Sequence, residues 1–262
     1  MKISDLQASF KRYAILEKGL MPKSYKGICS TLRMLAEFSK TEEIQHLDKN
    51  IVRGFLYQGR IAKAWKAQTF RNHWQAIKTF FGWCVKNGYV KHNPATDIEK
   101  PKPEKCLPRC LSQEDAKKIQ YHAAWHLWKY RLERYRNLAI ISTLMMTGLR
   151  LQELINLEVQ DVNLASGDIL VRKGKGLKDR VIPIHPRLLP ILRDYFEKKK
   201  ATGQPAQHFF TGIRSSKQLT QKDVRRICKK IGIDAGVKFS PHMLLHTFAR
   251  EMIYNYFNLY TL

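Results

Sequence analysis

The feature that most constrains the fold is an apolar stripe with helical spacing in residues 70–84. Its members recur at alternating steps of four and three residues: Phe70, Trp74, Ile77, Phe81 and Cys84. Such spacing places large apolar side chains on one face of an α-helix, and Asn87-Gly88 supplies a stop signal just after it. Similar patterns predict two earlier helices, one capped by Ser24 and one capped by Asp48. The first part of the chain is therefore expected to be helical, with these stripes forming its core.

A segment rich in proline and lysine separates this helical region from the rest of the chain. Residues 101–111 read PKPEKCLPRCL, and their prolines oppose a continuous helix, which leaves an extended connector. For a chain of 262 residues, an average of roughly 150 residues per domain also favours two domains. We therefore expect a helical domain in residues 1–100, a linker in residues 101–111 and a second domain in residues 112–262.

The second domain is expected to combine helices with one small β element. Ser112 begins a capping pattern, and a long helical stretch then ends at Gly148. Residues 168–185, DILVRKGKGLKDRVIPIH, contain two short β-rich runs around a Gly-Lys-Gly turn, which predicts a β-hairpin. Helical patterns resume in residues 185–200 and 220–233. The predicted fold class is mainly α, with a small β-hairpin or sheet in an α+β second domain.

Positive charge dominates the chain. Its 47 lysine and arginine residues outnumber 22 aspartate and glutamate residues, which gives a formal net charge of +25. An excess of this size attracts polyanions, so nucleic acid is the leading candidate partner. The rival polyanion is a membrane surface, but we find no lipidation signal, no separate basic amphipathic helix and no apolar run near the roughly 20 residues that cross a bilayer. We therefore expect a cytoplasmic protein without membrane association.

The cysteines do not indicate a disulfide framework or a metal centre. Their number, five, is odd, and most lie in predicted helices, where free thiols behave as small apolar side chains. The CLPRC segment could begin a zinc site, but neither a second cysteine pair nor a histidine lies near it. The sequence therefore predicts neither a metal nor any other cofactor.

Three motifs with charged side chains follow one another in the second domain. They are TGLRLQEL in residues 147–154, GKGLKDR in residues 174–180 and SPHMLLHTFA in residues 240–249. In this order they resemble the tyrosine site-specific recombinases, the phage integrase family that includes the Xer recombinases. The first domain also resembles that family's helical core-binding domain. The resemblance implies a DNA-clamping domain in residues 1–100, followed by a tyrosine-recombinase catalytic domain.

The resemblance implies a chemistry that uses neither metal nor nucleotide. In this family a tyrosine attacks a DNA phosphodiester, which forms a 3′-phosphotyrosyl bond and releases a 5′-hydroxyl. Arg150 matches the first catalytic arginine, and arginine suits this role because its planar fork can hold two phosphate oxygens. Glu153 matches the acidic residue that braces the site, on the same helical face as Arg150, although an ordinary surface ion pair is nearly as good an interpretation.

Two further residues match the family's proton-handling groups. Lys175 matches the lysine that acts as general acid toward the leaving 5′-oxygen, and the flanking glycines would permit close approach to DNA. His242 matches the histidine of the HxxR element, which donates to the phosphate or handles a proton. For His246, the second histidine of this segment, we expect a structural role.

Further cationic residues are candidate contacts for DNA phosphates. They are Lys66, Arg71 and Lys78 around the helix with the apolar stripe, and Lys173, Lys178 and Arg180 around the predicted hairpin loop. For any single one an ordinary solvated position competes, and only the summed charge argues for contact with DNA. The resemblance further implies a homo-oligomer, a tetramer in the family, assembled on double-stranded DNA.

Two departures from the family pattern bear on activity. The second arginine of HxxR should follow His242 by three residues, but Leu245 stands there, and loss of one such donor typically lowers the rate by about 10²- to 10³-fold. Arg250 lies about 140° further around a helix and is no obvious substitute. The resemblance also places the nucleophilic tyrosine beyond the position of Leu262, so Tyr254 and the tyrosines after it precede that place. We expect a C-terminally truncated member that binds DNA and does not cleave it.

Two alternatives remain open. A non-catalytic regulator that competes with an active relative for recombination sites would bind its own site far more tightly than other DNA. A general RNA- or ribosome-associated basic protein would account for the charge, but it would not account for the ordered motifs.

Overall fold

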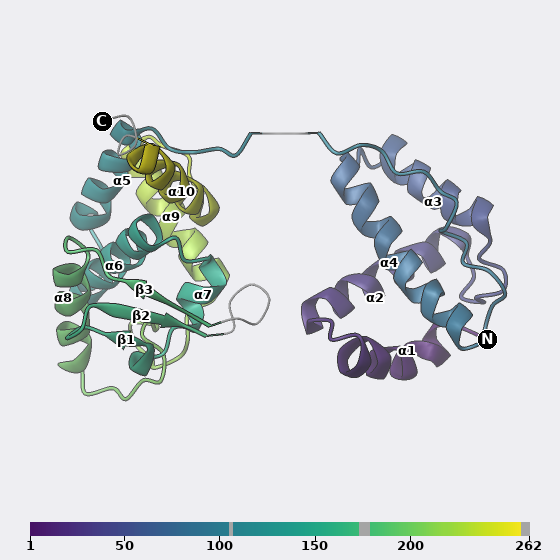
Figure 1. Cartoon of the computed structure of the whole chain (residues 1–262), viewed down its shortest axis with the longest axis horizontal. Helices are drawn as coiled ribbons and strands as arrows, with labels where there is room; N and C mark the ends of the chain where they lie inside the picture. Colours follow the sequence, from purple (N-terminus) through teal and green to yellow (C-terminus); the bar gives the residue numbers. More distant parts are fainter. Residues whose placement is uncertain (105–106, 173–178, 258–262) are drawn as a thin grey trace. The chain divides into compact units, whose positions relative to one another are not determined.

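The computed structural model describes residues 1–104, 107–172 and 179–257, with only the backbone for residues 255–257. The chain forms two compact units, residues 1–106 and residues 107–262, and each has its own apolar core (Figure 1). The prediction of a mainly α fold with a small sheet is confirmed. Among the described residues, no helix is both long enough and apolar enough to cross a bilayer.

The first unit is built from helices. Its elements are α1 (Ile3–Arg12), a π-helical turn (Tyr13–Glu17), α2 (Pro22–Ser39), α3 (Lys49–Ile61) and α4 (Ala67–Lys86). All five members of the apolar stripe on α4 are buried in the core of this unit, so the predicted core helix is confirmed. Asp48 caps α3 as expected, because its carboxylate accepts a hydrogen bond from the backbone nitrogen of Ile51 at 2.8 Å.

Two helix starts in the first unit differ from the prediction. α2 begins at Pro22 and not after Ser24, because proline suits the first turn of a helix, where a missing N–H group costs nothing. α1 was not predicted, although it buries Ile3, Leu6 and Phe10 at helical steps in the same core. These steps of three and four residues were a signal that the sequence carried.

The second unit packs helices against a small antiparallel sheet (Figure 1). Its elements are α5 (Gln113–Trp125), α6 (Arg131–Thr147), α7 (Leu151–Asn156), a 3-10 turn (Val159–Asp161), β1 (Val162–Asn163), β2 (Asp168–Val171), β3 (Arg180–Pro183), α8 (Leu189–Lys200), α9 (Gln221–Ala235) and α10 (Pro241–Phe257). The strand order is β1-β2-β3, and Val171 pairs with Arg180. The predicted hairpin is confirmed as the β2–β3 pair, whereas β1 was not predicted because two residues are too short to show alternation.

A close approach of α6 and α10 fixes the start of the TGLR segment. Gly148 ends α6 as predicted, with a φ of +64°, a conformation that residues with side chains rarely adopt. A Cβ atom at this position would also lie 2.5 Å from Cε1 of Phe248 on α10. Only glycine therefore allows this turn and this contact together, directly before Arg150.

The helix α10 also holds the segment that enters the second unit. The hydroxyl of Thr247 accepts a hydrogen bond from the backbone nitrogen of Leu111 at 2.9 Å. The guanidinium of Arg250 donates to the carbonyl oxygen of Leu111 at 2.6 Å and pairs with Glu251 at 2.7 Å. The side chain of Arg250 therefore binds the backbone at the start of the second unit.

Candidate functional site

Arg150 lies at the junction between α6 and α7. It precedes α7 with an extended backbone, φ −71° and ψ 151°, and Glu153 is the third residue of that helix. The carboxylate of Glu153 accepts a hydrogen bond from the backbone nitrogen of Arg150 at 2.9 Å, which caps the start of the helix. The expectation that both residues share one helical face is therefore wrong, since Arg150 lies outside the helix and is reached by a capping bond.

Glu153 binds two guanidinium groups at once. Its Oε1 accepts from Nη1 of Arg150 at 2.9 Å and from Nη1 of Arg180 at 3.2 Å, while its Oε2 accepts from Nη2 of Arg180 at 2.7 Å. The side chain of Glu153 is only 9% exposed, but those of Arg150 and Arg180 are 46% and 37% exposed. The carboxylate is therefore the buried centre of the cluster, and both guanidinium groups reach solvent.

The protonation of this cluster follows from its hydrogen bonds. Burial acts to raise the pKa of Glu153, but the bonds from Arg180 and Arg150 outweigh it and hold the pKa below its usual value. The hydrogen bond to Glu153 raises the pKa of Arg180. At neutral pH the cluster thus contains one carboxylate and two guanidinium ions, which leaves a net positive charge beside solvent.

His242 and His246 lie on the first turns of α10. His242 is exposed, and its ring centroid lies 5.1 Å from that of His246 in an edge-on arrangement. Leu245 is half-buried on the same helix, next to the fully buried Leu244. Within the described ranges, no hydrogen bond or ion pair joins His242 to the cluster around Glu153. The structure therefore brings Arg150, Glu153 and Arg180 together, and leaves His242 without a bond to them.

Three predicted lysines fall in the connection between β2 and β3. Lys173, Lys175 and Lys178 lie outside the described residues. The strands that flank them are described, and the pairing of Val171 with Arg180 fixes where the connection begins and ends. Since Arg180 is bonded to Glu153, one end of this connection is anchored at the cluster.

Two of the three cationic candidates of the first unit, Arg71 and Lys78, have local partners. Lys66 is exposed and directly precedes α4. Nη1 of Arg71 donates to the carbonyl oxygen of Pro101 at 3.4 Å, and Nζ of Lys78 lies 4.8 Å from the ring centroid of Trp74. Both Arg71 and Lys78 are half-buried and keep part of their charged groups in solvent. Nothing in these contacts prevents them from reaching a phosphate.

The partnership between Arg180 and Glu153 was missed by sequence reasoning. The two residues are 27 positions apart, and their contact depends on how β3 pairs with β2 and how the sheet packs near α7. The GKGLKDR motif placed Arg180 near the hairpin loop but gave no sign of its acidic partner. No local signal of the sequence could have found this pair, because it is a tertiary contact.

The second unit matches a known protein family. The model of the phage integrase family matches residues 111–262 of this chain. XerA, a tyrosine recombinase of Pyrococcus furiosus, is 34% identical over 193 residues, which cover 73% of this chain and 63% of XerA. XerC of Thermodesulfovibrio yellowstonii is 28% identical over 254 residues, which cover 94% of this chain and 81% of XerC. The chain thus spans less than two thirds of the first relative and most of the second.

Solved structures share the fold. A lambda integrase dimer bound to a core DNA site superposes with a TM-score of 0.70 at 16% identity, over 95% of this chain and 89% of that one. The recombinase XerH, in a complex with its difH substrate after cleavage, gives a TM-score of 0.70 at 23% identity, over 86% of this chain and 67% of that one. At these identities the likeness concerns the fold alone.

Proposed function

Because the chain belongs to the phage integrase family, we propose that it binds duplex DNA and holds one backbone phosphate against Arg150. The observation that carries this proposal is the buried carboxylate of Glu153 with guanidinium groups on two sides. One carboxylate cannot neutralise two guanidinium ions, so the cluster keeps positive charge facing solvent. The anionic groups of DNA are its phosphates, and one guanidinium can donate two hydrogen bonds to a phosphate.

Glu153 is proposed to position both arginines and not to touch DNA. Arg150 donates to Glu153 through its backbone nitrogen and Nη1, while its side chain remains 46% exposed. The rest of the guanidinium can therefore face a phosphate without giving up the carboxylate. Fixed donors of this kind stabilise charge that develops on phosphate oxygens, because they need no reorganisation during the reaction.

The other family roles are proposed for Lys175 and His242. Lys175 would give a proton to the leaving 5′-oxygen, and the anchoring of Arg180 would keep its loop near the phosphate. His242 would donate a hydrogen bond to a phosphate oxygen, for which its exposure at the start of α10 is suitable. Both roles are carried over from the family by the matching motifs.

We further propose that residues 1–262 bind DNA without cleaving it. Leu245 stands three residues after His242, where the family has its second arginine, and leucine can neither donate a hydrogen bond nor carry charge. The presence of Leu245 at this position favours a non-catalytic DNA-binding regulator as the second candidate function.

A nicked suicide duplex tests the function directly. The chain is incubated with duplexes that carry candidate recombination sites, and covalent adducts are sought by denaturing electrophoresis, while binding is measured by fluorescence anisotropy. We expect binding without an adduct, and Arg150→Ala should weaken binding by several-fold. An adduct would refute the non-cleaving proposal. Failure to bind any duplex would refute the proposed function itself.

Assembly on DNA is part of the same proposal. Lambda integrase has been solved both as a dimer on a core site and as a tetramer on a Holliday junction. We propose that this chain also binds DNA as more than one copy. Analytical ultracentrifugation with a palindromic duplex should show at least two chains per duplex, and a complex that stays at one chain would contradict this part.

A further inference from the structure

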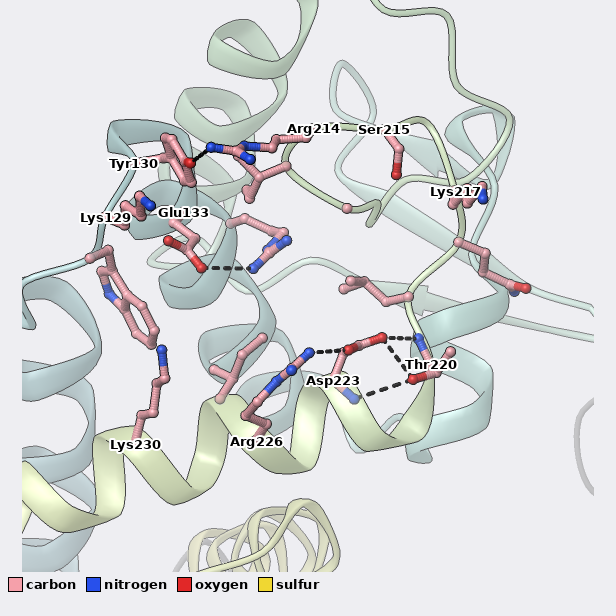
Figure 2. Close-up of a pocket in the computed structure, with 17 residues that line it drawn as sticks. Lys129, Tyr130, Glu133, Arg214, Ser215, Lys217, Thr220, Asp223, Arg226 and Lys230 are labelled. Atoms are coloured by element: carbon pink, nitrogen blue, oxygen red, sulfur yellow. Dashed lines mark hydrogen bonds and ion pairs between the residues drawn. The ribbon is translucent and has the colours of Figure 1, made fainter.

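A second cationic site lies in the second unit and shares no lining residue with the cluster around Glu153. It is a pocket of about 690 Å³ between the α5–α6 connection, residues 212–220 and α9 (Figure 2). Six cationic side chains line it: Lys129, Arg136, Arg214, Lys217, Arg226 and Lys230. Only two carboxylates, those of Glu133 and Asp223, accompany them. This volume is within the range of small-molecule binding sites.

Both carboxylates are engaged within the wall of the pocket. Asp223 accepts hydrogen bonds from the backbone nitrogen and the hydroxyl of Thr220 at 2.9 and 2.7 Å, and it pairs with Arg226. Glu133 lies 3.9 Å from Arg136. The two acids therefore compensate Arg226 and Arg136, and they leave the other four cations of the pocket without acidic partners.

Three of those four cations lie over aromatic rings. Lys129 and Arg214 lie 5.7 and 4.9 Å from the ring centroid of Tyr130, and Lys230 lies 5.6 Å from that of Trp128. Among the described residues, no ion pair involves these three cations or Lys217. The ring contacts fix the positions of the cations but leave their charge uncompensated.

The cations occupy both edges of the pocket. Figure 2 shows Lys129, Arg214 and Lys217 along one edge, and Arg226 and Lys230 on α9 along the other. A ligand between the edges would meet positive charge from both sides. Mutual repulsion of the four unpaired cations is the cost of this arrangement, and a bound polyanion would relieve it.

An unused hydrogen-bond donor belongs to the same pocket. The indole Nε1 of Trp128 is buried and has no acceptor in the part of the chain that the structure describes. Buried donors normally have partners, so an unpaired one favours a ligand that brings acceptor oxygens.

We propose that this pocket binds a ligand with several linked phosphate groups. Phosphates suit it because each brings at least two acceptor oxygens and at least one negative charge, and charge-assisted bonds to lysine and arginine are strong. The aromatic faces are already occupied by cations, so the recognised part of the ligand is its phosphate chain and not a stacked base. The phosphates could come from a free polyphosphate compound or from a DNA strand, and the chemistry is the same.

The test measures binding of inorganic tripolyphosphate to the full chain by calorimetry at 150 mM sodium chloride. We expect one saturable site that the double variant Lys217→Gln/Lys230→Gln weakens about 100-fold, since each charge-assisted bond contributes tenfold or more. The matched control is Lys222→Gln/Lys229→Gln, which removes the same charge from exposed positions of α9 outside the pocket. Control affinity should stay within twofold of wild type.

A local signal identifies the site independently. Tripolyphosphate should change tryptophan fluorescence in wild type and in Trp125→Phe, whereas Trp128→Phe should abolish the change. Equal weakening in the pocket and control double variants would assign the binding to the general positive charge and overturn the proposal. Absence of a saturable site would overturn it as well.

Competition with duplex DNA separates the two sources of phosphate. If duplex displaces tripolyphosphate and the pocket variant loses duplex affinity while the control does not, the phosphates come from a DNA strand. If duplex and tripolyphosphate bind together, the ligand is a free polyphosphate. Loss of the tripolyphosphate site with intact duplex binding would leave the proposed function standing, so the two proposals can fail separately.

Discussion

At the scale of single residues, Glu153 is the acidic group on which the candidate site depends. Its carboxylate binds both Arg150, which directly precedes α7, and Arg180, which belongs to β3. We expect Glu153→Gln to lower the free energy of unfolding by about 1–3 kcal/mol at pH 7, less than for a fully buried pair because both guanidinium groups reach solvent. Urea unfolding measures this, with the exposed Glu197→Gln as a control that should be neutral.

The effect of Glu153→Gln on the free energy of unfolding should depend on pH. The pKa of Glu153 is lower in the folded chain than its usual value of 4.5, so the carboxylate adds stability at any pH above 4.5. That stability is lost as the pH falls through the folded pKa. The difference in unfolding free energy between wild type and Glu153→Gln should therefore narrow below about pH 4.5. A difference that stays constant from pH 7 to pH 3 would contradict the assigned ion pairs.

Lys199 on α8 is a second residue whose charge is linked to folding. Its amine is buried and donates to the carbonyl oxygens of His208 and Phe209 at 2.6 and 2.8 Å. Burial lowers the pKa of Lys199 to about 8, from a usual value of 10.5. A neutral amine can still make both bonds, since it keeps two N–H donors.

As the pH rises, Lys199 therefore loses its proton at a lower pH in the folded chain than in the unfolded chain. Between about pH 8 and 10.5 the unfolded state binds more protons at this group, so the contribution of Lys199 to stability rises with pH. Relative to Lys199→Met, wild type should gain on the order of 1–3 kcal/mol across that interval. Unfolding by urea at pH 7.5 and 10 checks this. The exposed Lys198→Met should show no such change with pH.

At the scale of elements, the α6–α10 contact sets the position of Arg150. Gly148→Ala is opposed by a positive φ and by a clash of the new Cβ atom with Phe248. At Gly236, which ends α9, φ is also +64°, but the new Cβ atom would have no neighbouring atom within 4 Å. We expect Gly236→Ala to cost about 1 kcal/mol and Gly148→Ala about 1–3 kcal/mol more. Only Gly148→Ala should also weaken DNA binding. Equal effects of the two variants would show that the contact with Phe248 is unimportant.

The elements could be predicted because their signals are local. The stripe on α4 and the cap at Asp48 act within a few residues, and periodicity and hydrogen-bond chemistry are enough to find them. The site was predicted only in part. Arg150 and Glu153 follow from one motif, but the bond from Arg180 requires the β2–β3 register and the packing of the sheet near α7. Such contacts depend on the folded chain and have no local signature.

At the scale of the whole molecule, the net charge of +25 bears directly on the proposed binding of DNA. Each lysine or arginine that neutralises a phosphate releases bound counterions, so log K falls linearly with log salt with a slope of about −0.9 per contact. A lysine or arginine that contacts no phosphate adds only to the overall positive potential of the protein. Its removal changes the affinity for DNA but leaves the salt slope nearly unchanged. The slope can therefore separate true phosphate contacts from solvated cations.

This distinction gives a test of the cations predicted for the first unit. Lys66→Gln/Lys78→Gln should reduce the magnitude of the slope by about 2, because both side chains are predicted to contact phosphates. The control Lys117→Gln/Lys198→Gln removes the same charge from exposed positions of α5 and α8, and its slope should match wild type. Anisotropy titrations of a labelled duplex between 50 and 300 mM salt give both values. If the two double variants behave alike, Lys66 and Lys78 are ordinary solvated residues, and the phosphate contacts of this chain lie elsewhere.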